Sequence, residues 1–189
     1  VNLLAGGIGR TVRAYNIDDP EYSGIVVKIP NDSNSIETNA NIIDKYNRAR
    51  ARLGILFPAL IIPCTKGSIG EGLSFNISGS SNKIKPDFII IQPRYLPWDK
   101  AQKHLTAGEE AQVEGFYNEI LTPEMQRRGV KDRDGGVAKN YGLAIDAATN
   151  KVIHSSLRGF DPEFFDFDGS ETERMPVVPF ISRIVQDQI

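Results

Sequence analysis

A cluster of turn-forming residues, NIDDP at positions 16–20, follows closely behind a glycine-rich segment and restricts the structures that this segment can adopt. The segment at positions 4–15 reads LAGGIGRTVRAY, with three glycines in four positions. Glycine-rich turns hold phosphate groups either ahead of a helix or between two strands. A helix beginning at Gly9 would end within about two turns because the turn cluster stops it, whereas the helix of a dinucleotide-binding unit usually runs about three turns or more. The sequence therefore predicts two strands joined by the glycines.

The segments that follow predict a small antiparallel sheet and one long helix. Residues 24–29, GIVVKI, form a β-branched run bounded by a glycine and a proline, which is typical of a strand. Together with the two strands around the glycines, this run completes an antiparallel meander. At positions 36–53 apolar residues recur every three or four positions, which indicates an amphipathic helix. Asn34 with Glu37 resembles a capping pair at its start, and Gly54 closes it.

More strands and a helical region are predicted further along the chain. Short strands are expected at residues 60–63, 72–77 and 87–91. The last of these, DFIII, is the most apolar, so we expect it at the centre of its sheet. Helix-favouring residues dominate positions 99–128, with breaks near Gly108 and Pro123.

The carboxyl-terminal part of the chain also contains one predicted β-hairpin, formed by residues 141–145 and 151–155. The distribution of elements predicts an α+β fold in two parts. Residues 1–92 form a β-rich lobe with one helix, and residues 93–189 form a helix-rich lobe.

Composition narrows the classes of partner. The formal net charge of −2 and a pI near 5.8 give no global electrostatic reason to bind nucleic acid, so we expect no nucleic-acid partner. Cys64 is the only cysteine, which excludes an internal disulfide and a thiolate cluster for zinc. No apolar run reaches the ~20 residues of a membrane span, so none is expected. The start at Val1 looks trimmed, so a removed targeting segment stays compatible with the sequence.

Three motifs together resemble the protein-kinase-like fold. LAGGIGRTVRAY is similar to the glycine-rich loop and the strand after it, GIVVKIP to the strand that carries the phosphate-binding lysine, and DFIIIQPRYLP to the last small-lobe strand with the hinge. The chain is short for a kinase domain, and the nearest comparison is with the small kinases that bacteria deliver by type III secretion. The resemblance implies a two-lobed kinase-like fold of reduced size that uses ATP and Mg²⁺.

The nucleotide-binding residues follow from this resemblance and from simple chemistry. Gly7 and Gly9 would let backbone N–H groups approach the phosphates without a Cβ in the way. Lys28 stands among valines and isoleucines, where an ammonium has little structural use unless it meets an acid or a phosphate. A kinase holds this lysine with a carboxylate from the next helix. Glu37 and Asp44 share one helix face, and we prefer Asp44 because Glu37 also suits the helix dipole.

The catalytic loop is expected in RRGVKDRDGGVAKNYGLAID. By the resemblance, Asp132 or Asp134 is the base that accepts the proton of the substrate hydroxyl, and Asn140 binds metal. A rival alignment places the base at Asp146 and the metal ligand at Asn150, although these residues also suit a hairpin turn.

The expected magnesium-binding aspartate is Asp166, in the segment EFFDFDG, which resembles the D-F-G turn of kinases. Oxygen ligands of this kind suit Mg²⁺. The competing interpretation of this segment is a solvated acidic turn, because Asp161 and Glu163 lie close by.

The sequence therefore predicts a kinase that transfers the γ-phosphate of ATP to serine or threonine of a protein. The resemblance to secreted effectors further implies delivery into a host cytoplasm and a host protein as substrate, with a chaperone as one candidate. A pseudokinase or interaction module without phosphate transfer is the alternative. A nucleotide-dependent oxidoreductase is a third interpretation, and an extended strand at residues 11–15 would eliminate it.

Overall fold

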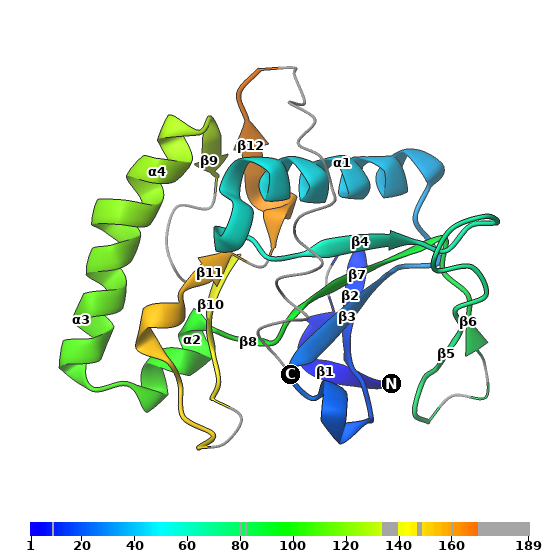
Figure 1. Cartoon of the computed structure of the whole chain (residues 1–189), viewed down its shortest axis with the longest axis horizontal. Coiled ribbons are helices and arrows are strands. Elements are labelled where there is room, and N and C mark those ends of the chain that lie inside the picture. Colours follow the sequence, from blue (N-terminus) through cyan, green and yellow to red (C-terminus); the bar gives the residue numbers. More distant parts are fainter. Residues whose placement is uncertain are drawn as a thin grey trace.

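The computed structural model of the chain describes residues 1–8, 10–79, 81, 83–133, 140–146, 149–159 and 161–169, with the backbone alone for residues 4–8. In this part of the chain the fold is α+β, as the sequence predicts (Figure 1). None of the described helices is both long and apolar enough to cross a membrane.

An antiparallel five-stranded sheet is built entirely from the amino-terminal half (Figure 1). Its strands are β1 (Asn2–Ile8), β2 (Val12–Asn16), β3 (Ile25–Pro30), β4 (Leu60–Pro63) and β7 (Phe88–Pro93). They lie in the order β1-β2-β3-β7-β4. The predicted meander is confirmed, because β1 pairs with β2 and β2 with β3. The most apolar strand, β7, lies inside the sheet between β3 and β4, also as predicted.

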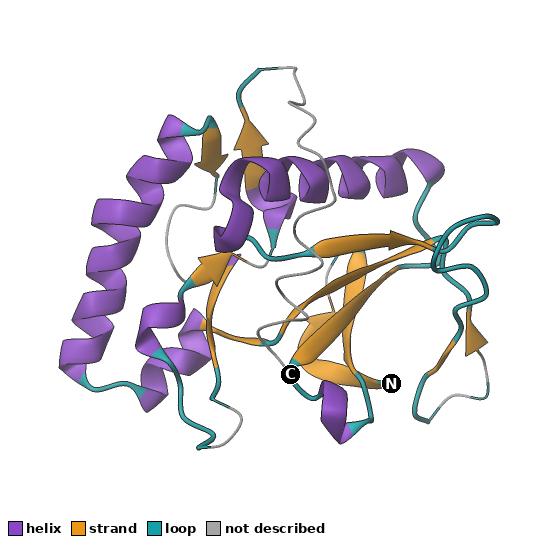
Figure 2. Cartoon of the chain, viewed as in Figure 1, coloured by secondary structure: helices purple, strands orange, loops and turns teal. Residues whose placement is uncertain are grey.

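Helix α1 (Ile36–Leu53) has the predicted boundaries and packs on one face of this sheet (Figure 2). Its N-cap is Ser35 rather than Asn34: the backbone N–H of Thr38 donates to the Ser35 hydroxyl at 3.1 Å. The Asn34 amide instead donates to the Thr11 carbonyl at 2.8 Å, which ties the helix entry to β2. Gly54 ends the helix with a φ of 55°, a conformation that favours glycine.

The two faces of the sheet are covered by different elements. The α1 face contributes Val12 and Ile90 to the larger apolar cluster. The opposite face buries a smaller cluster, made of Tyr15, Val27, Ile29 and Ile89. A two-stranded hairpin of β5 (Phe75–Asn76) and β6 (Lys83–Ile84) packs against the smaller cluster. Because side chains alternate along a strand, Lys28 points away from this hairpin and toward α1.

The carboxyl-terminal half begins with strand β8 and a series of helices. These are β8 (Tyr95–Pro97), α2 (Trp98–Ala101), α3 (Ala107–Phe116), a π-helical turn (Tyr117–Leu121) and α4 (Thr122–Arg127). The first predicted break falls slightly earlier than Gly108, because Thr106 caps α3 in a capping box with Glu109. Pro123 does not break the helix, since it lies in the first turn of α4, where a missing N–H is tolerated.

Short strands complete this half. Strand β9 (Val130–Asp132) pairs with β12 (Phe165–Phe167), and β10 (Tyr141–Ala144) lies between β8 and β11 (Arg158–Gly159). Among the described residues, the predicted hairpin has one β-bridge, between Ile145 and Val152. Two further backbone hydrogen bonds join the same segments, from the Asp146 N–H to Lys151 and from the Ile153 N–H to Ala144. Strand β10 itself pairs with β8 and β11. Gly142 permits the approach to β8, because a Cβ there would lie 2.7 Å from the Leu96 carbonyl oxygen.

The two halves share one core. The larger cluster runs from Tyr46 and Phe57 in the first half to Tyr141 and Phe165 in the second. The rings of Phe57 and Phe165 meet edge-on with centroids 6.2 Å apart. Arg52, in the last turn of α1, donates to the carbonyls of Gly129 and Asp168 at 2.7 and 2.6 Å. Helix α1 is therefore fastened to the β9–β12 pair as well as to the sheet.

Candidate functional site

Lys28 is a buried lysine on the face of β3 that meets α1. Only 5% of it is exposed, and its ammonium donates to the Tyr46 hydroxyl at 2.8 Å. The same ammonium lies 5.4 Å from the centre of the Tyr46 ring. Tyr46 is held by the core, where its ring meets Phe57 with centroids 5.6 Å apart. Strand and helix thus fix the position of the ammonium together.

Two carboxylates from the carboxyl-terminal half lie near this lysine. Burial lowers the pKa of Lys28, while the charges of Asp161 and Glu163 oppose that change. Burial also raises the pKa of Tyr46 well above its usual value, so this phenol remains a neutral hydroxyl at physiological pH. Lys28 therefore has a neutral partner in α1 and anionic neighbours in the segment that follows β11.

Glu163 contacts three other segments around the lysine. Its carboxylate accepts a hydrogen bond from the Thr11 hydroxyl at the start of β2. Its backbone carbonyl accepts from the Lys45 ammonium at 2.5 Å and from the Arg133 guanidinium at 3.1 Å. Burial raises the pKa of Glu163, and the bond from Thr11 opposes that change. The glycine-rich strand pair, α1 and the end of β9 thus all meet at this residue.

Asp132 and Asn140 form a second part of the site. The Asn140 amide donates to the Asp132 carboxylate at 3.1 Å, and Asn140 is 1% exposed. The pKa of Tyr141 is raised by burial and then by the charge of Asp132. In the β9–β12 ladder, Asp132 lies opposite Phe165, close in the chain to the acids that face Lys28. The structure thus places in contact two residues that the sequence analysis assigned to the same catalytic loop.

Asp166, the predicted magnesium ligand, does not belong to the group of residues around Lys28. It sits on β12 with its side chain 54% exposed and forms an ion pair with Arg133 at 3.2 Å. Phe165 and Asp166 point to opposite sides of the strand, and it is Phe165 that enters the core. The acids near Lys28 are instead Asp161 and Glu163. The sequence interpretation mentioned these two only as neighbours that favour a solvated turn around Asp166. Asp161 lies two positions after Gly159, the last residue of β11, and an acid this close to a strand end was the available signal.

Asp44, the helix acid chosen from the sequence, also does not point toward Lys28. Asp44 is 52% exposed and pairs with Arg48 at 2.9 Å on the solvent side of α1. Glu37 is exposed in the first turn. The reason is helical geometry: the buried stripe is formed by Ile42, Tyr46, Ala49 and Leu53. Asp44 is two residues from Tyr46, about 200° around the helix, so Tyr46 reaches Lys28 in place of a carboxylate.

The structure places the remaining site residues predicted from the sequence as follows. Gly7 lies within β1, close to the turn into β2. Gly9 and Asp134 lie outside the described residues. Asp146 belongs to a turn: its carboxylate accepts from the Thr149 N–H and its carbonyl from the Asn150 N–H, both at 2.8 Å. This contact pattern is the hairpin-turn chemistry that competes with the rival catalytic alignment.

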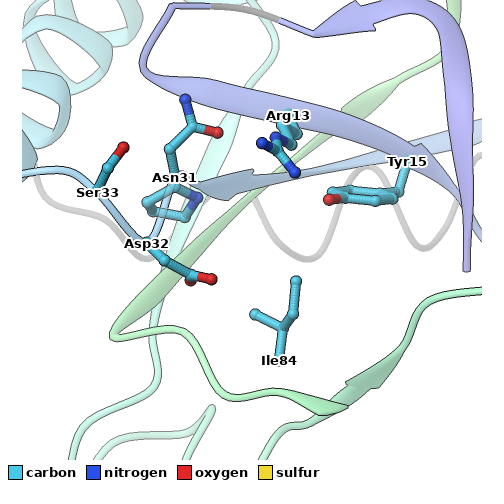
Figure 3. Close-up of a pocket in the computed structure, with 7 residues that line it drawn as sticks. Arg13, Tyr15, Asn31, Asp32, Ser33 and Ile84 are labelled. Carbon is cyan, nitrogen blue, oxygen red and sulfur yellow. The ribbon is translucent and has the colours of Figure 1, made fainter. Parts of the chain in front are cut away.

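A small cavity of about 200 Å³ lies on the opposite side of the sheet (Figure 3). Arg13 and Tyr15 line it from β2, Asp32 from the loop after β3, and Ile84 from β6. Arg13 and Tyr15 alternate with Val12 and Ala14 along the strand, so they face away from Lys28. This cavity is therefore separate from the lysine site.

Comparison with known proteins adds no assignment: no protein-family model matches the chain, and no curated protein is significantly similar to it. The site must be interpreted from its own geometry.

Proposed function

We propose that this protein is an ATP- and Mg²⁺-dependent protein kinase that phosphorylates serine or threonine. The observation that carries the proposal is Lys28, a buried ammonium held by Tyr46 and faced by Asp161 and Glu163. Burying a lysine is costly, and this cost is explained if the ammonium binds phosphate. The chain order of β3, α1, β4 and β7, together with the sheet order β1-β2-β3-β7-β4, supports a kinase-like small lobe.

The site contains residues that suit Mg²⁺ bound with a nucleotide. Magnesium usually binds through one or two carboxylates, together with phosphates and water. Asp161 would supply the main carboxylate and Asn140 a carbonyl oxygen. Among the described residues, no three His, Cys, Asp or Glu side chains gather into a metal-binding group, which suits a metal bound largely by its substrate. The metal would neutralise charge on the transferred phosphate.

Asp132 is our choice for the base. In the proposed reaction the acceptor hydroxyl oxygen bonds to the γ-phosphorus, the bond from that phosphorus to the bridging oxygen breaks, and ADP leaves. The hydroxyl proton passes to the Asp132 carboxylate. The Asn140 amide orients that carboxylate through its 3.1 Å hydrogen bond. The resemblance to secreted bacterial kinases extends the proposal to a host protein as acceptor, with a chaperone as one candidate.

Two acids five residues apart provide the test. Phosphate transfer from γ-labelled ATP to a generic protein should fall about 100-fold or more in Lys28→Met and in Asp161→Asn. Asp166→Asn removes a charge from the same segment, but its side chain is exposed and pairs with Arg133. We expect that control to keep nearly full activity. Equal loss in both Asp variants, or none in Lys28→Met, would contradict the proposal.

A pseudokinase is the second candidate, and two sequence features favour it. Eight positions separate Asp132 from Asn140, more than in the kinase catalytic loop, and the residue two before Asp132 is Val130 instead of histidine. In that case Mg²⁺ and ATP would still raise the unfolding temperature through Lys28, but no phosphate would be transferred. Measuring both quantities on the same samples separates the two functions.

A further inference from the structure

The cavity on the sheet face away from Lys28 has both polar and apolar walls (Figure 3). Its volume is about 200 Å³, below the ~300–1,000 Å³ of pockets that hold drug-sized molecules. Tyr15, Pro30 and Ile84 supply apolar surface, whereas the start of β2 and the loop between β3 and α1 supply polar side chains. The cavity therefore suits a small ligand that has polar groups as well as an apolar part.

Arg13 and Asp32 bring opposite charges to this cavity. Arg13 lies on β2 and Asp32 in the loop after β3, and both residues are exposed. Within the described part of the chain, neither side chain makes an ion pair or a hydrogen bond, with the other or with any third residue. A purely anionic ligand would be repelled by Asp32, and a purely cationic one by Arg13. A ligand that carries both charges can meet both residues favourably.

Asn31 supplies a hydrogen-bond acceptor beside the two charges. Its Nδ2 atom donates to the Arg10 carbonyl at 2.9 Å, which fixes the orientation of the amide. Its Oδ1 atom is buried and has no hydrogen-bond partner among the described residues. Figure 3 shows this oxygen on the side of the amide toward Arg13, and the Tyr15 hydroxyl directed into the space between Arg13 and Ile84. Because buried acceptors without a donor are rare in proteins, an N–H group of a ligand is expected here.

We propose that this cavity binds a small zwitterion of the α-amino-acid type. The carboxylate of the ligand pairs with the Arg13 guanidinium, which can donate two parallel hydrogen bonds to it. The ammonium has three N–H donors and donates to the Asp32 carboxylate and the Asn31 amide oxygen. A small apolar side chain lies against Tyr15 and Ile84. The site is separate from the proposed kinase reaction, because it is on the face of the sheet that turns away from Lys28.

Probes that lack one charge at a time test this assignment. L-Valine, isobutylamine and 3-methylbutanoate share one branched carbon skeleton, but the amine lacks the carboxylate and the acid lacks the ammonium. Their dissociation constants would be measured by titration calorimetry on the whole chain, with glycine, L-alanine and L-leucine titrated alongside. L-Valine should bind about tenfold or more tightly than either analogue, because each analogue loses the hydrogen bonds of one charged group.

Two variants remove the charges of the protein at similar size. Arg13→Gln and Asp32→Asn should each weaken the binding of L-valine about tenfold or more. Arg13→Gln should bind isobutylamine at least as tightly as wild type does, because the repelling cation is gone. Since neither side chain has a partner among the described residues, both variants should unfold within about 2 °C of wild type.

Matched controls make the same two changes outside the cavity. Arg94→Gln and Asp99→Asn lie at exposed positions that do not line it, and both should keep the wild-type affinity for L-valine. Equal binding of L-valine and its two analogues would overturn the inference, as would wild-type affinity in Arg13→Gln and Asp32→Asn. Absence of binding by all four amino acids would overturn it too. Each of these results leaves the kinase proposal intact, because that proposal is tested at Lys28 and Asp161.

Discussion

The two faces of the central sheet bury similar aliphatic side chains but differ in polar content. The face toward β5 and β6 buries Tyr15 with three aliphatic residues. The face toward α1 also buries Lys28 and Gln92, two of the three buried polar or charged residues among those described. Burying such groups lowers stability unless they are paired or have a function. The difference shows that one face buries mostly apolar side chains, whereas the other also buries Lys28, on which the proposed function rests.

The largest effect is expected for Asp132 at the end of β9, which is the proposed base. Asp132→Asn keeps the size of the side chain but removes its ability to accept a proton. We expect kcat to fall about 100- to 10,000-fold, while the dissociation constant of Mg·ATP stays within about threefold of wild type. Single-turnover transfer and calorimetry check the two quantities. A variant with wild-type kcat would exclude Asp132 as the base.

A substitution in the smaller apolar cluster, on the sheet face away from α1, should lower stability without changing activity. Ile29 is 1% exposed within the smaller cluster, so Ile29→Ala leaves a cavity and should cost about 2–4 kcal/mol of unfolding free energy. Denaturant titration gives that value. At a temperature where the variant remains folded, kcat/KM should match wild type. A large fall in kcat/KM would contradict the idea that only the face carrying Lys28 affects activity.

The pH dependence of stability should change more modestly in Glu163→Gln. Because burial raises the pKa of Glu163, the folded state binds its proton more tightly than the unfolded state does. This contribution to stability is complete below the ordinary glutamate pKa and is lost as pH rises through the folded-state pKa. The variant lacks this loss, so its stability relative to wild type should increase from acidic to neutral pH. Thermal unfolding across that range measures it, and parallel curves would contradict the assignment.

The smallest effect is expected for Asp44→Ala. This change removes an exposed ion pair with Arg48, which should cost no more than about 0.5 kcal/mol. Activity should remain at the wild-type level, because Tyr46 occupies the place facing Lys28. A strong loss of activity would show that Asp44 acts at the site, and that the contact of Tyr46 with Lys28 serves packing only.

The sequence predicted the local elements better than the contacts between distant segments. The boundaries of α1 and the order of β1, β2 and β3 follow from apolar periodicity and turn residues, which act locally. Lys28 could be selected because an ammonium in a β-branched run is conspicuous. The partner of Lys28 could not be selected, because several polar residues of α1 were available and only packing shows which one faces the sheet.

The choice of acid in the segment after β11 also could not be made from the sequence. Asp161 and Asp166 are five positions apart in an acidic segment, and composition does not distinguish them. The difference arises from pairing: β12 aligns Phe165 with Asp132 and turns Asp166 outward to Arg133. That pairing joins residues more than thirty positions apart in the sequence. Long-range register of this kind leaves little trace in a single sequence.

The attachment of Arg52 to the carbonyls of Gly129 and Asp168 has a consequence for local opening of the molecule. The last turn of α1 cannot separate from β9 and β12 without breaking these bonds and the contact of the guanidinium with the Phe167 ring, 5.7 Å away. Elements that open only together exchange their amide hydrogens as one cooperative unit. The carboxyl-terminal turn of α1 and the β9–β12 pair should therefore share one exchange free energy, although 76 positions separate Arg52 from Arg128.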